Sequence, residues 1–351
     1  MNNTDLNWKK LKNWLSTKSL KLDLSFKPER FKKGMGNLNY KILLNEEFAV
    51  IRRPPLGPIP PGANDMKREH TVMSALSKKL YLVPNSFILC EDPEIFGAPF
   101  HIIDFMEGET IEGGMIPAKW NNKDTARHLS KILIELLVKL HAINPESLGL
   151  ESFGKPQGFL DRQLKGWYNR GCIAQNNNPS KIMTDLYNLL NDKNIPEEKE
   201  YVILHNDFKL DNIMVFSSSE NNSNLQPTAI LDWDQATRGH PLYDLATLLS
   251  YWTTTDDTTS MKLLKQMPSA QEGFLDRSEA LKLYAELSGR NMQNFNWIYT
   301  LSLLKLGVVF QQLYAQFQRG TVTDIRYKDF GKIAEAAFER GLKSAENKDY
   351  I

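Results

Sequence analysis

Residues 204–212 read Leu204-His205-Asn206-Asp207-Phe208-Lys209-Leu210-Asp211-Asn212. Short apolar runs precede and follow this polar segment, at residues 201–204 and 213–216, and their composition predicts two buried strands. The polar residues therefore lie on a loop between strands. Asn and Asp form turns readily, so one interpretation is that this loop only connects the two strands.

The spacing of the polar residues favours a catalytic interpretation instead. The loop follows the pattern H-x-D-x-x-x-x-N from His205 to Asn212, which is the spacing of the catalytic loop that phosphotransferases use. Asp207 would orient or accept the proton of a substrate hydroxyl, and Lys209 would place a positive charge beside the transferred phosphoryl group. We therefore predict His205, Asp207 and Lys209 as catalytic residues and Asn212 as a metal ligand.

A second acidic segment follows the apolar residues 228–231, which predict another strand. It reads Asp232-Trp233-Asp234, and a carboxylate at the end of such a strand is where this chemistry needs its principal Mg²⁺ ligand. We predict Asp232 as that ligand. Asp234 is either a second ligand or substrate contact, or an exposed solvated carboxylate. Asp244 either caps the apolar helix that follows or accepts hydrogen bonds from the backbone of the catalytic loop.

These motifs resemble those of the aminoglycoside phosphotransferase family, which consists of small-molecule kinases with a protein-kinase-like fold. The resemblance rests on residues 205–212, 230–234 and 241–246, and it extends over roughly residues 32–341. Residues 50–55, 160–167 and 273–290 are similar to the branch found as free-standing bacterial proteins and as the kinase-like part of some acyl-CoA dehydrogenases.

The resemblance implies an α+β fold with two lobes. Residues 1–107 would form a nucleotide-binding lobe with a mixed or antiparallel sheet of about five strands and one helix. Residues 108–351 would form a larger, mainly helical lobe that carries the catalytic and acceptor-binding residues. ATP would lie between the lobes, with Mg²⁺ held by Asn212 and Asp232. Helical periodicity predicts helices at residues 125–143, 159–168, 182–190, 245–252, 277–288, 295–319 and 329–347.

Arg52 lies on a predicted strand at residues 48–53, where kinases place the lysine that binds the nucleotide phosphates. Arginine keeps the charge and binds phosphate through two nitrogen atoms, so we favour this role over an exposed position on a strand edge. Glu69, on a helix predicted at residues 65–80, is the expected ion-pair partner of Arg52.

Other nucleotide contacts follow only from the resemblance. Gly34 and Gly36 would form a turn over the phosphates, although an ordinary hairpin turn has the same sequence pattern. Asp104 and Met106 belong to residues 104–108, the hinge whose backbone would receive the adenine. The sequence does not distinguish ATP from GTP.

The acceptor is not identified by any motif. Aminoglycosides are polycations and need an acidic acceptor face, whereas the segments expected there carry Arg162, Lys165, Arg170, Arg277, Lys282 and Arg290. We therefore expect an anionic acceptor in contact with Arg162, and the acyl-CoA branch implies a hydroxyacyl-CoA. The alternatives are an aminoglycoside or other small-alcohol kinase, or a regulatory module that binds nucleotide without turnover. A module of that kind has no use for the base Asp207.

The composition of the chain excludes several other classes of protein. The chain has 351 residues and a formal net charge of +1, which gives no electrostatic case for binding nucleic acid or an anionic membrane. The two cysteines, Cys90 and Cys172, cannot form a disulfide framework or a structural zinc site. Residues 1–10 are polar, unlike a secretory signal, and no apolar run is long enough to span a bilayer. We expect a cytoplasmic enzyme; its oligomeric state does not follow from the sequence.

Overall fold

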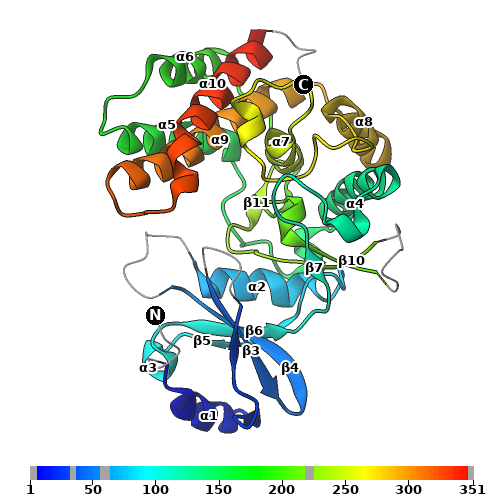
Figure 1. Ribbon diagram of the computed structural model, residues 1–351, viewed down its shortest axis with the longest axis vertical. Helices are drawn as coiled ribbons and strands as arrows, with labels where there is room; N and C mark the ends of the chain where they lie inside the picture. The colour runs from blue at the N-terminus through cyan, green and yellow to red at the C-terminus, as the bar shows by residue number, and fades with distance from the viewer. Residues whose placement is uncertain (1–5, 32–36, 56–63, 218–224, 347–351) are drawn as a thin grey trace. The chain divides into compact units, whose positions relative to one another are not determined.

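The structure is a computed structural model that describes residues 6–31, 37–55, 64–217 and 225–346. The chain forms two compact units (Figure 1). Unit 1 consists of Met1–Gly108, Leu148–Leu150 and Thr228–Ala236, and unit 2 consists of Glu109–Ser147, Glu151–Pro227 and Thr237–Ile351. The segment that carries Asp232 and Asp234 thus belongs to unit 1, although it follows the catalytic loop in the sequence.

A six-stranded sheet forms the centre of unit 1, in the order β1-β3-β4-β6-β5 with β2 paired to β3. Its strands are β1 (Leu22–Asp23), β2 (Glu29–Arg30), β3 (Leu38–Leu44), β4 (Glu47–Arg53), β5 (Ser86–Cys90) and β6 (Phe100–Asp104). Every described pair is antiparallel. The sixth strand, β2, was not predicted because its two residues are charged and exposed and show no apolar alternation.

The two faces of this sheet have different partners because side chains alternate along each strand. Ile51 and Ile102 lie in an apolar cluster with Leu11 and Leu15 of α1 (Trp8–Ser16). The short helix α3 (Pro93–Phe96) contributes Phe96 to the same cluster. The opposite face is covered by α2 (Met66–Leu76), so β4 and β6 present polar side chains to that helix. Figure 1 shows α1 and α2 on opposite sides of the sheet.

Unit 2 is mainly helical, as predicted. Its helices are α4 (Lys123–His141), α5 (Phe159–Ala174), α6 (Lys181–Asp192), α7 (Pro241–Tyr251), α8 (Arg277–Ser288), α9 (Phe295–Gln318) and α10 (Phe330–Glu346). Helix α9 packs against α5, α7 and α10, and every residue of α7 is buried. Gly307 of α9 allows the ring of Phe338 on α10 to approach the helix backbone, where a β-carbon would collide with the ring.

Short strands and 3-10 turns connect these helices. Strand β7 (Glu109–Thr110) pairs with β9 (Ile213–Phe216), and β8 (Val202–Leu204) pairs with β11 (Thr237–Gly239). Strand β10 (Gln226–Ile230) leads from unit 2 into unit 1. The 3-10 segments are Ala118–Trp120, Pro145–Leu148, Leu210–Asn212, Met261–Leu263 and Ile325–Asp329.

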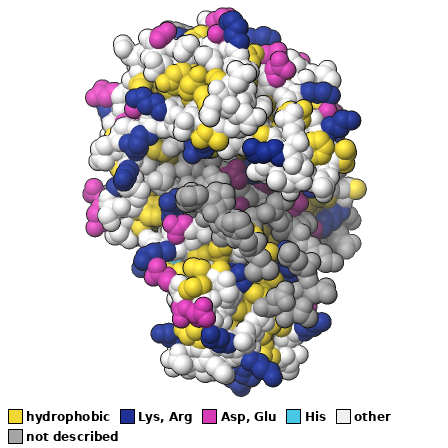
Figure 2. All heavy atoms as spheres, turned by 90° about the vertical axis from the view of Figure 1, so that its left-hand side faces the viewer, with side chains coloured by type: hydrophobic (Ala, Val, Ile, Leu, Met, Phe, Trp, Pro, Cys, Tyr) yellow, Lys and Arg dark blue, Asp and Glu magenta, His cyan; other side chains and the backbone are white. Residues whose placement is uncertain are grey.

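The surface carries both signs of charge. Basic and acidic side chains are interspersed over the face shown in Figure 2, in keeping with the formal net charge of +1. Within the described ranges, no helix is both long enough and apolar enough to cross a membrane.

Candidate active site

The catalytic loop predicted at residues 205–212 forms a tight turn in unit 2. It begins where β8 ends, passes through the 3-10 segment Leu210–Asn212 and continues directly into β9. Asn206 has a φ of 66°, in the left-handed region that Asn enters more readily than most residues. This backbone turn places Asp207 immediately after the buried strand.

Asp244 fixes the turn from the side of α7. Its two carboxylate oxygens accept the backbone N–H groups of His205 and Asn206, at 2.6 Å and 2.7 Å. The N-cap of α7 is His240, whose side chain accepts the Leu242 N–H. Of the two roles that the sequence left open for Asp244, the structure therefore shows the contact with the catalytic loop.

The charge of Asp244 is maintained although its side chain is fully buried. Burial raises the pKa of this carboxyl, but contacts with His141 and the His205 backbone outweigh burial and hold the pKa below its usual value. His141 Nε2 lies 3.4 Å from Asp244, and His141 Nδ1 lies 2.7 Å from the Tyr284 hydroxyl. An ionised Asp244 binds the two amides more strongly than a neutral acid would.

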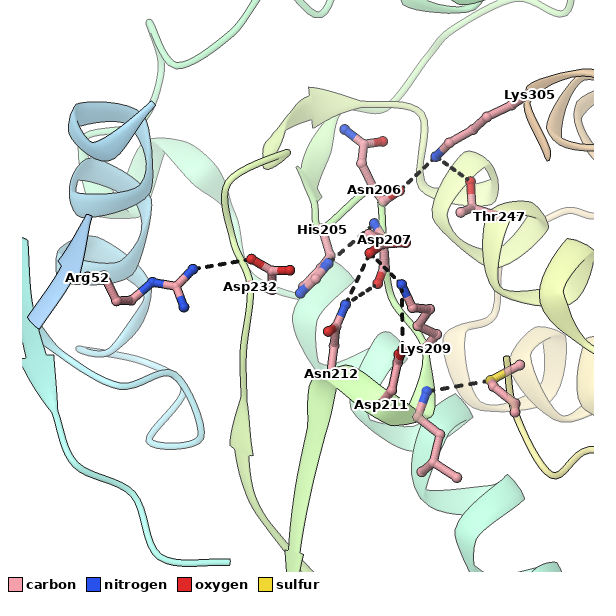
Figure 3. Close-up of polar contacts among 12 residues, drawn as sticks. Arg52, His205, Asn206, Asp207, Lys209, Asp211, Asn212, Asp232, Thr247 and Lys305 are labelled. Carbon is pink, nitrogen blue, oxygen red and sulfur yellow. Dashed lines mark hydrogen bonds and ion pairs between the residues drawn. The ribbon is translucent and has the colours of Figure 1, made fainter. Parts of the chain in front are cut away.

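Lys305 fixes the same turn from α9, and sequence reasoning missed it. Its ammonium group donates to the Asn206 carbonyl at 2.7 Å and lies 3.4 Å from the Thr247 hydroxyl (Figure 3). Lys305 is buried, and no carboxylate lies within ion-pair distance of it among the residues that the structure describes. Burial lowers its pKa to about 8, against the opposing effects of Asp207 and Asp244. The available signal was that Lys305 is the one charged residue in the sequence of α9.

The side chain of Asp207 is held by two neighbours within the loop. Lys209 Nζ lies 2.7 Å from Asp207 Oδ2, and the Asn212 side-chain amide donates to the Asp207 carbonyl at 2.8 Å and to Oδ2 at 3.3 Å (Figure 3). Burial lowers the pKa of Lys209, but Asp207 and Asp211 outweigh burial and raise it. The three polar residues of the motif are thus brought together, with Lys209 fully charged beside the carboxylate.

His205 has a supporting position in this arrangement. Its side chain is fully buried, and Nδ1 accepts the Asp207 backbone N–H at 3.3 Å. The ring also makes an edge contact with Phe208, with centroids 5.7 Å apart. These contacts orient the backbone that carries Asp207.

Unit 1 contains the predicted ion pair between Arg52 and Glu69. One guanidinium nitrogen of Arg52 lies 2.7 Å from Glu69 Oε1 and 3.2 Å from Asp232 Oδ1, and Figure 3 shows the second contact. Burial raises the pKa of Glu69, but the charge of Arg52 and the contact with His101 outweigh burial and lower it to about 2. Glu69 is therefore ionised and keeps Arg52 charged.

Asp232 is placed by its neighbours in the chain. The Ile230 N–H donates to the Leu82 carbonyl at 2.7 Å, and the buried indole of Trp233 donates to the Ile230 carbonyl at 2.8 Å. Asp232 itself has a φ of 66°, a strained conformation of the kind found at functional sites. Its side chain is 44% exposed, so a ligand has access to it. Asp234 is partly buried and acts on Arg52 through its charge.

The remaining predicted nucleotide contacts are less informative. The carboxylate of Asp104, the last residue of β6, accepts the Asn85 N–H at 3.1 Å, and burial raises its pKa. Met106 lies in the irregular segment after β6. Gly34 and Gly36 lie outside the described residues.

The predicted acceptor residues of unit 2 are mostly engaged elsewhere. Arg162 donates to the backbone carbonyls of Lys155 and Gln157, which fastens the preceding loop to α5. Carboxylates within the same unit lie within ion-pair distance of four other basic residues that suggested an anionic acceptor, namely Lys165, Arg277, Lys282 and Arg290. Arg170 differs, because its guanidinium stacks on Trp167 at 3.7 Å from the ring centroid. Its charge remains available to a ligand.

The donor groups are compatible with Mg²⁺. In the described part of the chain, no cluster of three or more His, Cys, Asp or Glu has metal-binding geometry. Mg²⁺ in kinases needs only one or two protein oxygens because the substrate phosphates supply others. Asn212 uses its amide nitrogen to hold Asp207, which leaves its amide oxygen for a cation. Asp232 has an exposed carboxylate of the required kind.

Comparisons with known proteins identify the family of the chain. The model of the phosphotransferase enzyme family matches residues 27–283. Acyl-CoA dehydrogenase family member 11 of Gallus gallus is 28% identical over 322 residues, which are 90% of this chain and 40% of that protein. The chain thus spans less than half the length of this relative.

Solved structures show the same fold. A protein from Ralstonia eutropha JMP134 assigned as an aminoglycoside phosphotransferase has a TM-score of 0.79 and 24% identity, covering 97% of this chain and 98% of its own. A thermostable mutant of aminoglycoside phosphotransferase APH(4)-Ia, in a ternary complex with AMP-PNP and hygromycin B, has a TM-score of 0.58 and 14% identity, covering 95% and 98%. These likenesses confirm the predicted two-lobed, protein-kinase-like α+β fold.

Proposed function

Because the chain belongs to the phosphotransferase enzyme family, a family of small-molecule kinases, we propose that it transfers the γ-phosphoryl group of ATP to a hydroxyl group with the help of Mg²⁺. The observation that carries this proposal is the catalytic turn. Asp207 is held by Lys209 and Asn212, on a backbone fixed by Asp244 and Lys305. Positioning of this kind, together with charge neutralisation, supplies most of the rate in phosphoryl transfer.

Asp207 acts as the base in this reaction. Its carboxylate accepts a hydrogen bond from the acceptor hydroxyl and takes the proton as the bond from oxygen to the γ-phosphorus forms. The bond between that phosphorus and the β,γ-bridging oxygen breaks, and ADP leaves. Lys209, beside Asp207, stabilises the negative charge on the transferred group. His205 is a positioning residue, since it contacts the backbone and the ring next to the base.

Arg52 binds the nucleotide phosphates, and Glu69 holds Arg52 in place. Asp104 and Met106 offer their backbone to the adenine, and Gly34 and Gly36 complete the phosphate contacts. The nucleotide complex of APH(4)-Ia, which has the same fold, supports the use of a nucleotide. Asn212 and Asp232 are the proposed metal ligands, and the bound Mg²⁺ would neutralise charge on the phosphates.

For the acceptor, we propose an anionic alcohol of the hydroxyacyl-CoA class. The similarity to acyl-CoA dehydrogenase family member 11 supports this class. The charge of Arg170, stacked on Trp167, is a second support because an aromatic ring and a cation together suit a nucleotide-containing thioester. Arg162 and Asp234 are further proposed contacts of the acceptor.

The test is transfer of label from γ-³²P-ATP to a panel of hydroxyacyl-CoAs, sugars, choline-like alcohols and aminoglycosides. We expect label on a hydroxyacyl-CoA, and loss of transfer when Mg²⁺ is chelated. Label on an aminoglycoside alone would contradict the proposed acceptor class but not the proposed phosphoryl transfer. Binding of ATP without transfer to any acceptor or to water would identify a regulatory module and contradict the proposed reaction.

A further inference from the structure

A chain of buried polar groups lies behind Glu69 in unit 1. His101 of β6 pairs directly with Arg52 of β4, so both side chains face α2. Arg52 contacts Glu69 Oε1 at 2.7 Å, and His101 Nε2 lies 3.3 Å from Glu69 Oε2. Glu69 and His101 are both fully buried. Each oxygen of this buried carboxylate therefore has its own positively polarised partner.

The chain continues on the far side of His101. The Ser86 hydroxyl, at the start of β5, lies 2.8 Å from His101 Nδ1 and also 2.8 Å from His70 Nδ1. Ser86 is buried, so water cannot substitute for either contact. A hydroxyl has one proton, and it therefore donates to one of the two rings and accepts from the other.

The direction of donation follows from Glu69. A carboxylate attracts His101 only when Nε2 carries a proton, and in a neutral ring Nδ1 is then an acceptor. In that form Ser86 donates to Nδ1, and His70 Nδ1–H donates to the Ser86 oxygen. In this arrangement both contacts of the Ser86 hydroxyl are hydrogen bonds. The Ser86 proton adds to the effect of Glu69: without it, Nδ1 of His101 has no donor, and Glu69 alone favours the proton on Nε2.

The direction of these hydrogen bonds matters because Arg52 contacts both Glu69 and Asp232. The same guanidinium nitrogen contacts Glu69 and Asp232, so the position of Arg52 depends on how firmly Glu69 is held. A Glu side chain has three rotatable bonds, and a contact on one oxygen alone leaves the other free to rotate away. Burial makes an unpaired carboxylate oxygen costly, which further favours the contact with His101.

We propose that Ser86 and His101 are positioning residues for the nucleotide: Ser86 fixes the proton of His101 on Nε2, His101 holds Glu69, and Glu69 presents Arg52 to the phosphates. The last step rests on the proposed function of Arg52. The earlier steps concern only the hydrogen bonds of unit 1.

The substitutions that test this proposal distinguish the effect of the proton donated by Ser86 from the effect of side-chain packing. Ser86→Ala removes the donor to His101. His101→Leu removes the contact with Glu69, whereas His101→Gln keeps an N–H at the place of Nε2 and needs no help from Ser86. Ser74→Ala is the matched control, because the Ser74 hydroxyl of α2 bonds only to a carbonyl of its own helix.

The first measurement is the affinity for AMP-PNP with Mg²⁺ by calorimetry. We expect Ser86→Ala and His101→Leu to weaken binding about tenfold, the effect of one hydrogen bond to a charged group. His101→Gln should stay within about twofold of the unchanged protein, and Ser86→Ala should then cause no further loss in that background. An equal loss in both backgrounds would mean that Ser86 acts by general packing, and would overturn the proposal.

The second measurement is the ¹⁵N spectrum of the histidine rings, which reports the protonated nitrogen. We expect a single Nε2–H form of His101 in the unchanged protein and a mixture of forms in Ser86→Ala. An unaltered Nε2–H form in Ser86→Ala would contradict the role of Ser86. This measurement does not need nucleotide. A protein that failed to bind AMP-PNP would contradict the proposed function, and the ¹⁵N spectrum would still show which nitrogen of His101 carries the proton.

Discussion

Replacing Lys305 with Met should separate the stability of the protein from its activity. Lys305 is a buried cation that no described carboxylate neutralises, and it holds the carbonyl of Asn206 next to Asp207, the proposed base. Methionine has a similar length and no charge. The substitution therefore removes the cost of burying the charge together with the bond that supports the turn.

The size of the first effect follows from the lowered pKa of Lys305. An unfolded lysine titrates at 10.5, and burial lowers the pKa in the folded protein to about 8. Between these values the unfolded state binds more protons than the folded state, so the free energy of unfolding rises with pH by about 1.4 kcal/mol per unit. From pH 8 to pH 9.5, the unchanged protein should gain about 2 kcal/mol relative to Lys305→Met, which lacks this titration.

The second effect concerns the turn. Loss of the hydrogen bond to the Asn206 carbonyl costs about 1.5–3 kcal/mol in the folded protein. Without this bond, Asp207 is also less well positioned for the reaction. We expect kcat to fall about tenfold or more in Lys305→Met, with little change in the affinity for nucleotide. At pH 7 the free energy of unfolding should be unchanged within about 1 kcal/mol, or raised, because the two contributions oppose each other.

Urea unfolding at several pH values between 7 and 9.5, combined with turnover at pH 7, measures both effects. Lys181→Met is the matched control, because the Lys181 side chain on α6 is 88% exposed. Its stability should follow that of the unchanged protein at every pH. The reasoning is refuted if the stability difference between Lys305→Met and the unchanged protein does not vary with pH, or if Lys305→Met retains full turnover.

Other consequences follow from the remaining contacts. Arg52→Ala and Glu69→Ala should each weaken ATP use, and the double variant should be little worse than Arg52→Ala because the two residues are in contact; additive losses in kcat/KM would show that they act separately. For an anionic acceptor, Arg170→Glu should raise the acceptor KM more than the ATP KM, and kcat/KM should fall as salt is added. Arg162→Glu should have the same direction of effect, and a smaller one because Arg162 binds backbone carbonyls. An acceptor KM that is lowered by both reversals would indicate a polycationic acceptor such as an aminoglycoside.

Much of this architecture was predictable because its signals are local. The motif from His205 to Asn212 lies within one turn, and its residues contact one another. The helices of unit 2 are predicted by the helical periodicity of their apolar residues. The match of residues 27–283 to the phosphotransferase enzyme family confirms the predicted family. The pair of Arg52 and Glu69 was found by analogy with kinases, and the structure contains that contact.

The remaining features depend on contacts between residues far apart in the chain. Nothing in the sequence near Lys305 shows that α9 brings it against the catalytic turn. Ser86 and His101 are ordinary strand residues until the register of β4, β5 and β6 places His101 beside Glu69 and Ser86 beside His101. The charge of Arg162 was visible, but its use by neighbouring carbonyls was not. Local pattern reveals elements and motifs, whereas pairing partners are set by tertiary packing.

The central claim is that Asp207 is the base of a phosphoryl transfer. The most direct test is the single-turnover rate of label transfer from γ-³²P-ATP to the acceptor found in the screen, compared between the unchanged protein and Asp207→Asn. Asp185→Asn serves as a control because Asp185 pairs with Lys181 on the exposed side of α6. We predict at least about a hundredfold lower rate for Asp207→Asn, with AMP-PNP affinity nearly unchanged, and a normal rate for the control. A normal transfer rate in Asp207→Asn would contradict the assignment of the base.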